Sequence, residues 1–125
     1  MIRRATWKLS KRPGSYGKQR EQVHPPAKQW SEIPNDQANL FLLAKAIITR
    51  FYRLNDKTEV TVYAYGSRVN GNFVSASDID LGVNCENHKS EIFYRPLHIK
   101  SPQGEIRIDV KLIQPDPTIT YIEIP

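Results

Sequence analysis

Residues 77–84, Ser-Asp-Ile-Asp-Leu-Gly-Val-Asn, place two carboxylates inside an apolar run. From Ile79 onward, aliphatic residues occupy every second position, and this period of two predicts a strand with two unlike faces. The aliphatic side chains would pack into a core, whereas Asp78 and Asp80 would face the opposite side. Because a slip of one residue would bury both carboxylates, the core fixes the register of this strand. The chain therefore has to fold around a sheet with one apolar face and one charged face.

Further strands are predicted on both sides of this one. Residues 58–66 are rich in β-branched and aromatic residues, which favour a central strand. Residues 105–113 alternate between apolar and polar in the same way. Residues 92–113 resemble a hairpin joined through Ser-Pro-Gln-Gly, and Pro96 predicts that its first arm lies at a sheet edge. Residues 119–125 predict a short final strand.

One long helix is predicted over residues 34–56. Asn35 or Asp36 can cap its start, and Arg53 near its end suits the helix dipole. The apolar residues at helical spacing are Leu40, Phe41, Ala44, Ile47, Ile48 and Phe51. This stripe predicts that the helix covers one face of the sheet.

Residues 1–34 predict an irregular basic arm ahead of a folded domain at residues 35–125. The arm is rich in Pro, Gly and charge and has neither a helical nor a strand period. Residues 1–30 hold eight basic residues and one acidic residue, a net charge of +7, whereas the rest of the chain carries −2. The arm is either a nucleic-acid-binding tail or a solvated tail, and its three aromatic residues could anchor parts of it on the domain.

Length, apolar runs and cysteine content exclude several classes of protein. A chain of 125 residues suits one domain. No apolar run approaches the roughly 20 residues that cross a bilayer, and no signal peptide is recognisable. Cys85 is the only cysteine, which excludes an intrachain disulfide and a cysteine-based metal cluster. We therefore expect a cytoplasmic protein with no membrane partner.

Three aspartates are predicted to share the charged face. Asp78 and Asp80 lie about 6.5–7 Å apart along their strand, and Asp109 joins them if residues 105–113 form the neighbouring strand. Carboxylates this close repel one another and raise one another's pKa. A hard divalent cation removes that repulsion, and Mg²⁺ completes its shell with water and phosphate. The cluster therefore indicates a site for a metal-bound phosphate ester.

Gly66 and Ser67 stand where the first strand ends. Glycine permits a turn that a Cβ would obstruct and lets a ligand approach the backbone, and Ser67 adds a hydroxyl donor. A helix beginning near Ser67 would direct free N–H groups at a phosphate. Arg68 comes next, in a loop over residues 68–77 that leads to the aspartates. A phosphate cradle beside a metal cluster suggests a site for a metal–nucleoside triphosphate complex.

Taken together, these residues resemble the polymerase-β-type nucleotidyltransferase superfamily, and most of all its minimal branch, over about residues 36–113. That branch carries Gly-Ser-x-(Ala/Val)-x-Gly followed by Ser-Asp-Ile-Asp-Leu. The matching positions here are Gly66, Ser67, Gly71, Ser77, Asp78, Asp80 and Asp109. The resemblance implies an α+β nucleotidyltransferase fold, with a mixed sheet of about four to five strands and helices packed on one face.

The resemblance also implies an enzyme that moves a nucleoside monophosphate from a nucleoside triphosphate, ATP above all, to a hydroxyl. Asp78 and Asp80 would bind two Mg²⁺ ions, for which Mn²⁺ can substitute, and Asp109 would complete the catalytic metal site. The nucleotide-binding residues would be Gly66, Ser67, Arg68 and Ser77.

The resemblance leaves several acceptors open. Minimal members often modify a protein, and many are antitoxins paired with a small helical toxin, so a tyrosine of a partner protein is one acceptor. A small molecule and an RNA end are others. Because the chain is short for an acceptor-binding domain, an oligomer or a partner could complete the site. The alternative from another class is a non-catalytic module of this fold, which neutralises a partner by contact or binds nucleic acid through residues 1–30.

Other conspicuous residues have ordinary structural explanations. We expect His24, His88 and His98 to be surface or packing residues, because none has a partner at ligand spacing. Tyr63 and Tyr65 are predicted to pack beneath the long helix, with stacking on a base as the alternative.

Overall fold

A computed structural model describes five segments of the chain. They are residues 22–54, 60–84, 97–102, 104–113 and 115–125. The predictions for the first 21 residues, Cys85, His88 and Pro96 lie outside these segments.

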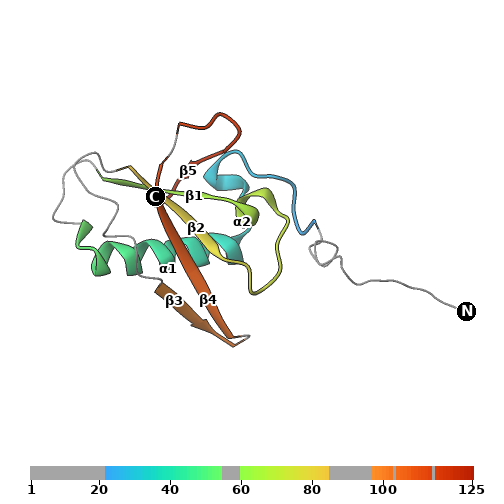
Figure 1. The fold of residues 1–125 in the computed structure, drawn as a ribbon. Coiled ribbons are helices and arrows are strands. Elements are labelled where there is room, and N and C mark those ends of the chain that lie inside the picture. The colour runs from blue at the N-terminus through green and yellow to red at the C-terminus, as the bar shows by residue number, and fades with distance from the viewer. Residues whose placement is uncertain (1–21, 55–59, 85–96, 103, 114) are drawn as a thin grey trace, which may run out of the picture.

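In the described segments, five strands form one mixed sheet (Figure 1). They are β1 (Thr61–Tyr65), β2 (Ile79–Asn84), β3 (Leu97–Ser101), β4 (Gly104–Leu112) and β5 (Ile122–Glu123). Their order across the sheet is β3-β4-β2-β1-β5, in which β2 and β4 are parallel and the other neighbours are antiparallel. Each segment predicted as a strand from its period overlaps an observed strand. The predicted α+β class with a mixed sheet is confirmed.

The predicted hairpin is present, and its second arm also pairs with β2, which lies far from it in the chain. Its arms β3 and β4 are antiparallel, and β3 is an edge strand of the sheet. The other side of β4 pairs in parallel with β2, so that Asp109 lies opposite Asp80. Residues directly opposite each other on neighbouring strands point to the same face of a sheet. The third predicted aspartate therefore shares a face with the first two.

Three helical segments accompany the sheet within the residues that the structure describes. They are η2 (Trp30–Glu32), α1 (Asn35–Phe51) and α2 (Ser67–Asn70). The predicted cap of the long helix is wrong in its position, because Pro34 is the N-cap residue and makes no side-chain cap hydrogen bond, although Asp36 Oδ1 accepts the N–H of Gln37 at 2.9 Å in the first turn. Asp36 lies instead in the first turn, where its charge suits the helix dipole. Among the described residues, no helix combines the length and the apolar character needed to cross a membrane.

Figure 1 shows α1 along one face of the sheet, and the hydrophobic core lies between the two. Its buried residues include Phe41, Ala44 and Ile48 of α1 and Val62, Ala64, Ile79, Leu81, Val83, Ile108 and Val110 of the strands. Tyr63 and Tyr65 alternate with the buried residues of β1 and face away from the helix. The prediction that these tyrosines pack beneath the helix is therefore wrong, since the period of two places them on the face that carries Asp80.

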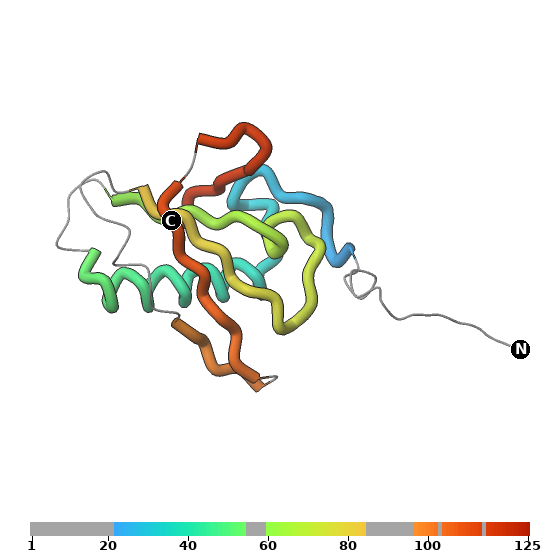
Figure 2. The backbone as a smooth tube through the Cα atoms, viewed as in Figure 1, coloured from blue at the N-terminus to red at the C-terminus, as the bar shows by residue number. Residues whose placement is uncertain are grey.

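Residues 22–34 of the predicted arm pack against the folded body, and Figure 2 shows this segment beside the chain that follows β1. The N–H of Val23 donates to the carbonyl of Gly71 at 2.7 Å, and the N–H of Ala27 donates to the carbonyl of Val69 at 2.9 Å. Ala27 is buried in the core. The predicted boundary at residue 34 stays a prediction, and the docked segment lies on its N-terminal side.

Candidate functional site

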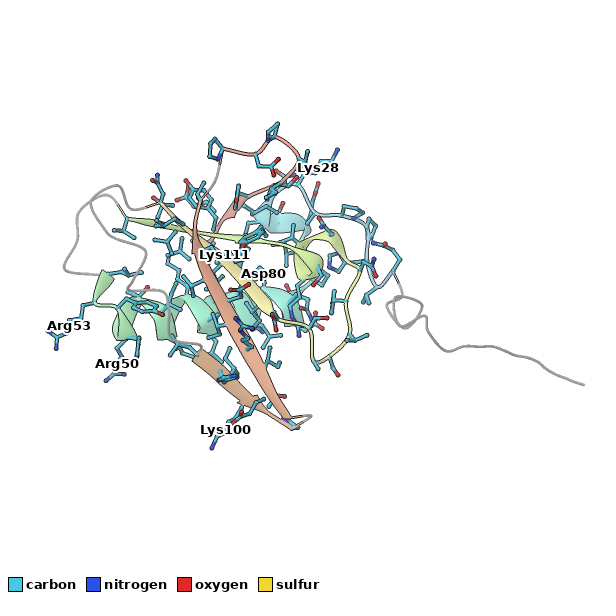
Figure 3. All side chains as sticks on the ribbon, viewed as in Figure 1. Lys28, Arg50, Arg53, Asp80, Lys100 and Lys111 are labelled. Atoms are coloured by element: carbon cyan, nitrogen blue, oxygen red, sulfur yellow. The ribbon has the colours of Figure 1, made fainter. Side chains whose placement is uncertain are left out.

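The charged face of the sheet gathers three carboxylates. Asp80 of β2 and Asp109 of β4 are direct register partners, and Asp78 lies immediately before β2. One carboxylate oxygen from each of the three residues lies within 4.8 Å of the others. Figure 3 shows Asp80 on β2 and Lys111 on the neighbouring strand β4. We call Asp78, Asp80 and Asp109 the aspartate cluster.

Gly66 lets the chain pass close beneath the aspartate cluster. It is the N-cap residue of α2 and has a φ of 86°, a left-handed conformation that glycine adopts without strain. A Cβ at this position would collide with the carboxylate of Asp80. Glycine is therefore required here both by the turn and by the close approach of a charged side chain.

Electrostatic repulsion within the cluster is incompletely balanced. Burial, followed by the charges of Asp109 and Asp78, raises the pKa of Asp80 to about 6, against the opposing effect of Lys111 and Arg68. The Lys111 Nζ atom lies 3.6 Å from Asp109 Oδ2, but the Lys111 side chain is 65% exposed. An exposed ammonium contributes little because water screens it. The cluster therefore favours an additional cation.

Arg68 lies beneath the loop between α2 and β2, although sequence placed it among the nucleotide contacts. Its side chain is only 2% exposed. Its Nε and Nη2 groups donate to the carbonyl of Ser77 at 3.1 and 2.8 Å, and Nη2 also donates to the carbonyl of Ser75 at 2.9 Å. Nη1 donates to Gln37 Oε1 at 2.8 Å. These contacts hold the loop that leads to Asp78, and they engage all three guanidinium nitrogens with acceptors within the protein.

Ser67 and Ser77 line the same open cavity as two of the aspartates. The cavity has a volume of about 420 Å³ and is lined by Ser67, Val74, Ala76, Ser77, Asp78 and Asp80. Ser77 is nevertheless 95% buried, with 5% of its surface exposed, and its Oγ accepts the N–H of Val74 at 2.9 Å. Its hydroxyl therefore shapes the loop, whereas Ser67 remains the serine at the start of α2 that faces the cavity beside the carboxylates.

A family model described as polymerase beta, nucleotidyltransferase matches residues 47–122, which is more than half of the chain. The chain belongs to the polymerase-β nucleotidyltransferase family. The match includes the Gly66-Ser67 turn and all three aspartates of the cluster. No curated protein and no solved structure matches the chain.

Membership of the nucleotidyltransferase family gives the aspartate cluster a chemical interpretation. Three carboxylates whose oxygens lie within 4.8 Å of one another could hold a divalent cation. Hard cations such as Mg²⁺ bind through carboxylate oxygens and keep further positions for water or phosphate. The donor set of the aspartate cluster therefore fits a divalent metal centre beside the cavity.

The sequence did not reveal two residues that contribute to the candidate site. Gln37, in the first turn of α1, is buried and accepts the hydrogen bond from Arg68, and no sequence motif marks it. Tyr121, just before β5, lies with its ring centroid 5.1 Å from that of Tyr65, which is the register partner of Asp80. The alternation in β1 could have placed Tyr65 on the charged face, but the approach of Tyr121 depends on long-range strand pairing.

Proposed function

We propose that this protein is a Mg²⁺-dependent nucleotidyltransferase that moves a nucleoside monophosphate from a nucleoside triphosphate, ATP first of all, to a hydroxyl acceptor. The observation that carries the proposal is the aspartate cluster, whose three carboxylate oxygens lie within 4.8 Å of one another beside the cavity at Ser67. Three ionised carboxylates in a partly buried site repel one another, and a bound cation removes that repulsion.

Each part of the site has a separate role in this proposal. Asp78 and Asp80 would hold the metal ions, and Asp109 of β4 would complete the catalytic metal site. Two Mg²⁺ ions, or Mn²⁺ in their place, would stabilise the charge that develops on the transferred phosphoryl group and its leaving pyrophosphate. Ser67, which lines the cavity together with Asp78 and Asp80, and the backbone after Gly66 would contact the β- and γ-phosphates.

The proposed acceptor is a hydroxyl on a partner protein, such as a tyrosine of a small helical toxin, as the minimal branch suggests. The basic residues at positions 1–30 would serve as an additional contact for nucleic acid, and an oligomer could supply part of the acceptor site. In this proposal the protein acts in the cytoplasm.

A label-transfer experiment tests the proposal. The protein is incubated with ATP labelled at the α-phosphate, Mg²⁺ and candidate acceptors, and Asp80→Asn is compared with Asp116→Asn, which changes an exposed aspartate outside the cluster. We expect metal-dependent triphosphate binding and label transfer in the wild type and Asp116→Asn, and loss of transfer by at least a hundredfold in Asp80→Asn, which corresponds to about 2.7 kcal/mol. Equal behaviour of the two variants, or no Mg²⁺-dependent triphosphate binding at all, would contradict the proposal and leave a non-catalytic module of this fold.

A further inference from the structure

Three tyrosines gather on the sheet face that carries the aspartate cluster. Tyr63 and Tyr65 belong to β1, and Tyr121 directly precedes β5. The ring centroid of Tyr121 lies 5.1 Å from that of Tyr65 and 6.3 Å from that of Tyr63, with interplanar angles of 58° and 73°. Aromatic rings about 4.5–7 Å apart in tilted or edge-to-face geometry stabilise each other's orientation. We call these three rings the aromatic shelf.

Gly82 has no side chain, and the ring of Tyr121 occupies the space where one would lie. It lies in β2 between its register partners Tyr63 and Lys111. A Cβ at Gly82 would lie 3.1 Å from a ring carbon of Tyr121 and 3.0 Å from a side-chain carbon of Ile113, both closer than an ordinary van der Waals contact. The Tyr121 ring therefore lies directly over the strand that carries Asp80.

The aromatic shelf and the aspartate cluster are continuous. Tyr65 lies opposite Asp80, which in turn lies opposite Asp109. Because neighbouring strands are about 4.8 Å apart, the shelf begins one strand away from the carboxylates. A planar group lying on the shelf would be held next to the proposed metal centre.

The shelf retains surface for a ligand. Tyr63, Tyr65 and Tyr121 are each only partly buried, and in the described part of the chain the long helix packs on the opposite face of the sheet. Glu123 lies opposite Tyr63 and places an acidic residue at the outer edge of the shelf. A carboxylate there disfavours a phosphate and suits the amino group of a heterocycle. Every nucleobase has a flat face that can stack on such rings.

We propose that the aromatic shelf stacks a nucleobase beside the aspartate cluster. This inference rests on the proposed nucleotidyl transfer and adds where a base is held during it. The base belongs to the triphosphate donor or to a nucleotide at the end of the acceptor. Both sources present the same planar heterocycle to the tyrosine rings.

The test separates binding of the base from binding of the phosphates. Calorimetry in the presence of Mg²⁺ compares ATP with inorganic tripolyphosphate, which lacks a base, for the wild type, Tyr121→Leu and the matched control Tyr121→Phe. If the donor base stacks on the shelf, Tyr121→Leu binds ATP about tenfold more weakly, and its affinity for tripolyphosphate is unchanged. Tyr121→Phe keeps the ring and should stay within about twofold of the wild type for both ligands.

A second probe identifies an acceptor base. If the shelf serves the acceptor, Tyr121→Leu leaves ATP binding unchanged and weakens binding of a single-stranded hexanucleotide with a free 3′ hydroxyl about tenfold. Tyr63→Leu gives the same comparison if Tyr121→Leu does not fold. Equal affinities of the leucine and phenylalanine variants for both base-containing probes would contradict the proposal that the shelf stacks a base. Failure of the wild type to bind either ATP or tripolyphosphate would instead contradict the proposed function, and the base-stacking role with it.

Discussion

At the scale of single residues, the geometry of the site depends on the close approach of Gly66 to Asp80. Gly66→Ala should destabilise the protein by about 1–3 kcal/mol through its backbone conformation alone, because a φ of 86° with a ψ of −158° is essentially restricted to glycine. The added Cβ would also displace the Asp80 carboxylate, so Mg²⁺ affinity should fall. Denaturant unfolding and Mg²⁺ titration measure the two effects.

The matched control for this substitution is Gly104→Ala. Gly104 also has a positive φ, of 123°, but a Cβ there would meet no atom within 4 Å. This variant should lose stability and keep its Mg²⁺ affinity. Equal Mg²⁺ affinities in the two variants would show that the position of Asp80 does not depend on the glycine beneath it.

Asp80 also makes the stability of the metal-free protein depend on pH. Its pKa of about 6 in the folded protein lies above the ordinary value of 3.8, so the folded state binds the proton more tightly than the unfolded chain. The resulting stabilisation is fully present below about pH 4 and is lost as pH rises through 6. Thermal unfolding between pH 4 and 7 should show this loss in the wild type and not in Asp80→Asn.

Because Mg²⁺ binds the ionised carboxylate, it should stabilise the wild type more at pH 7 than at pH 5. Equal stabilisation by Mg²⁺ at the two pH values would contradict the assignment of the raised pKa to Asp80.

At the scale of elements, the loop between α2 and β2 depends on the buried guanidinium of Arg68. Arg68→Met would leave the carbonyls of Ser75 and Ser77 without their donors. An unsatisfied buried polar group costs about 1–3 kcal/mol, so we expect a loss of about 2–4 kcal/mol in unfolding free energy. Mg²⁺ affinity should fall as well, because Asp78 follows this loop directly. Arg107→Met, at an exposed position of β4, is the control and should change neither quantity by more than about 0.5 kcal/mol.

The elements also show how far the sequence alone could lead. A period of two is a local property, and it correctly indicated which side chains of β2 share a face. Which strands are neighbours depends on contacts distant in the chain, so Asp109 could be placed beside Asp80 only on the condition that β4 pairs with β2. The direction of the Arg68 side chain could not be predicted from the sequence either. Its acceptor Gln37 lies 31 residues away, and the burial of a charged side chain depends on that partner.

At the scale of the whole molecule, the docked segment at residues 22–34 packs against α2, the short helix that begins at Ser67. Ala27→Asp would place a charge at a position that is 2% exposed and should detach the segment. We expect a loss of about 2–3 kcal/mol, comparable to exposing the buried side chain of Ile33. Chemical denaturation measures it, with Ala46→Asp on the exposed side of α1 as the control. An unchanged midpoint would show that the docking contributes nothing to stability.

The parallel pairing of β2 with β4 has a kinetic consequence. The two strands are far apart in the chain, with β3 between them, and contacts of this kind form slowly because a long loop must close first. A metal centre shared by Asp80 and Asp109 cannot exist before that closure. A bound ion would then stabilise the native state more than the transition state for folding. We therefore expect Mg²⁺ to slow unfolding in stopped-flow experiments while leaving the folding rate nearly unchanged, so that the ion prolongs the lifetime of the native state.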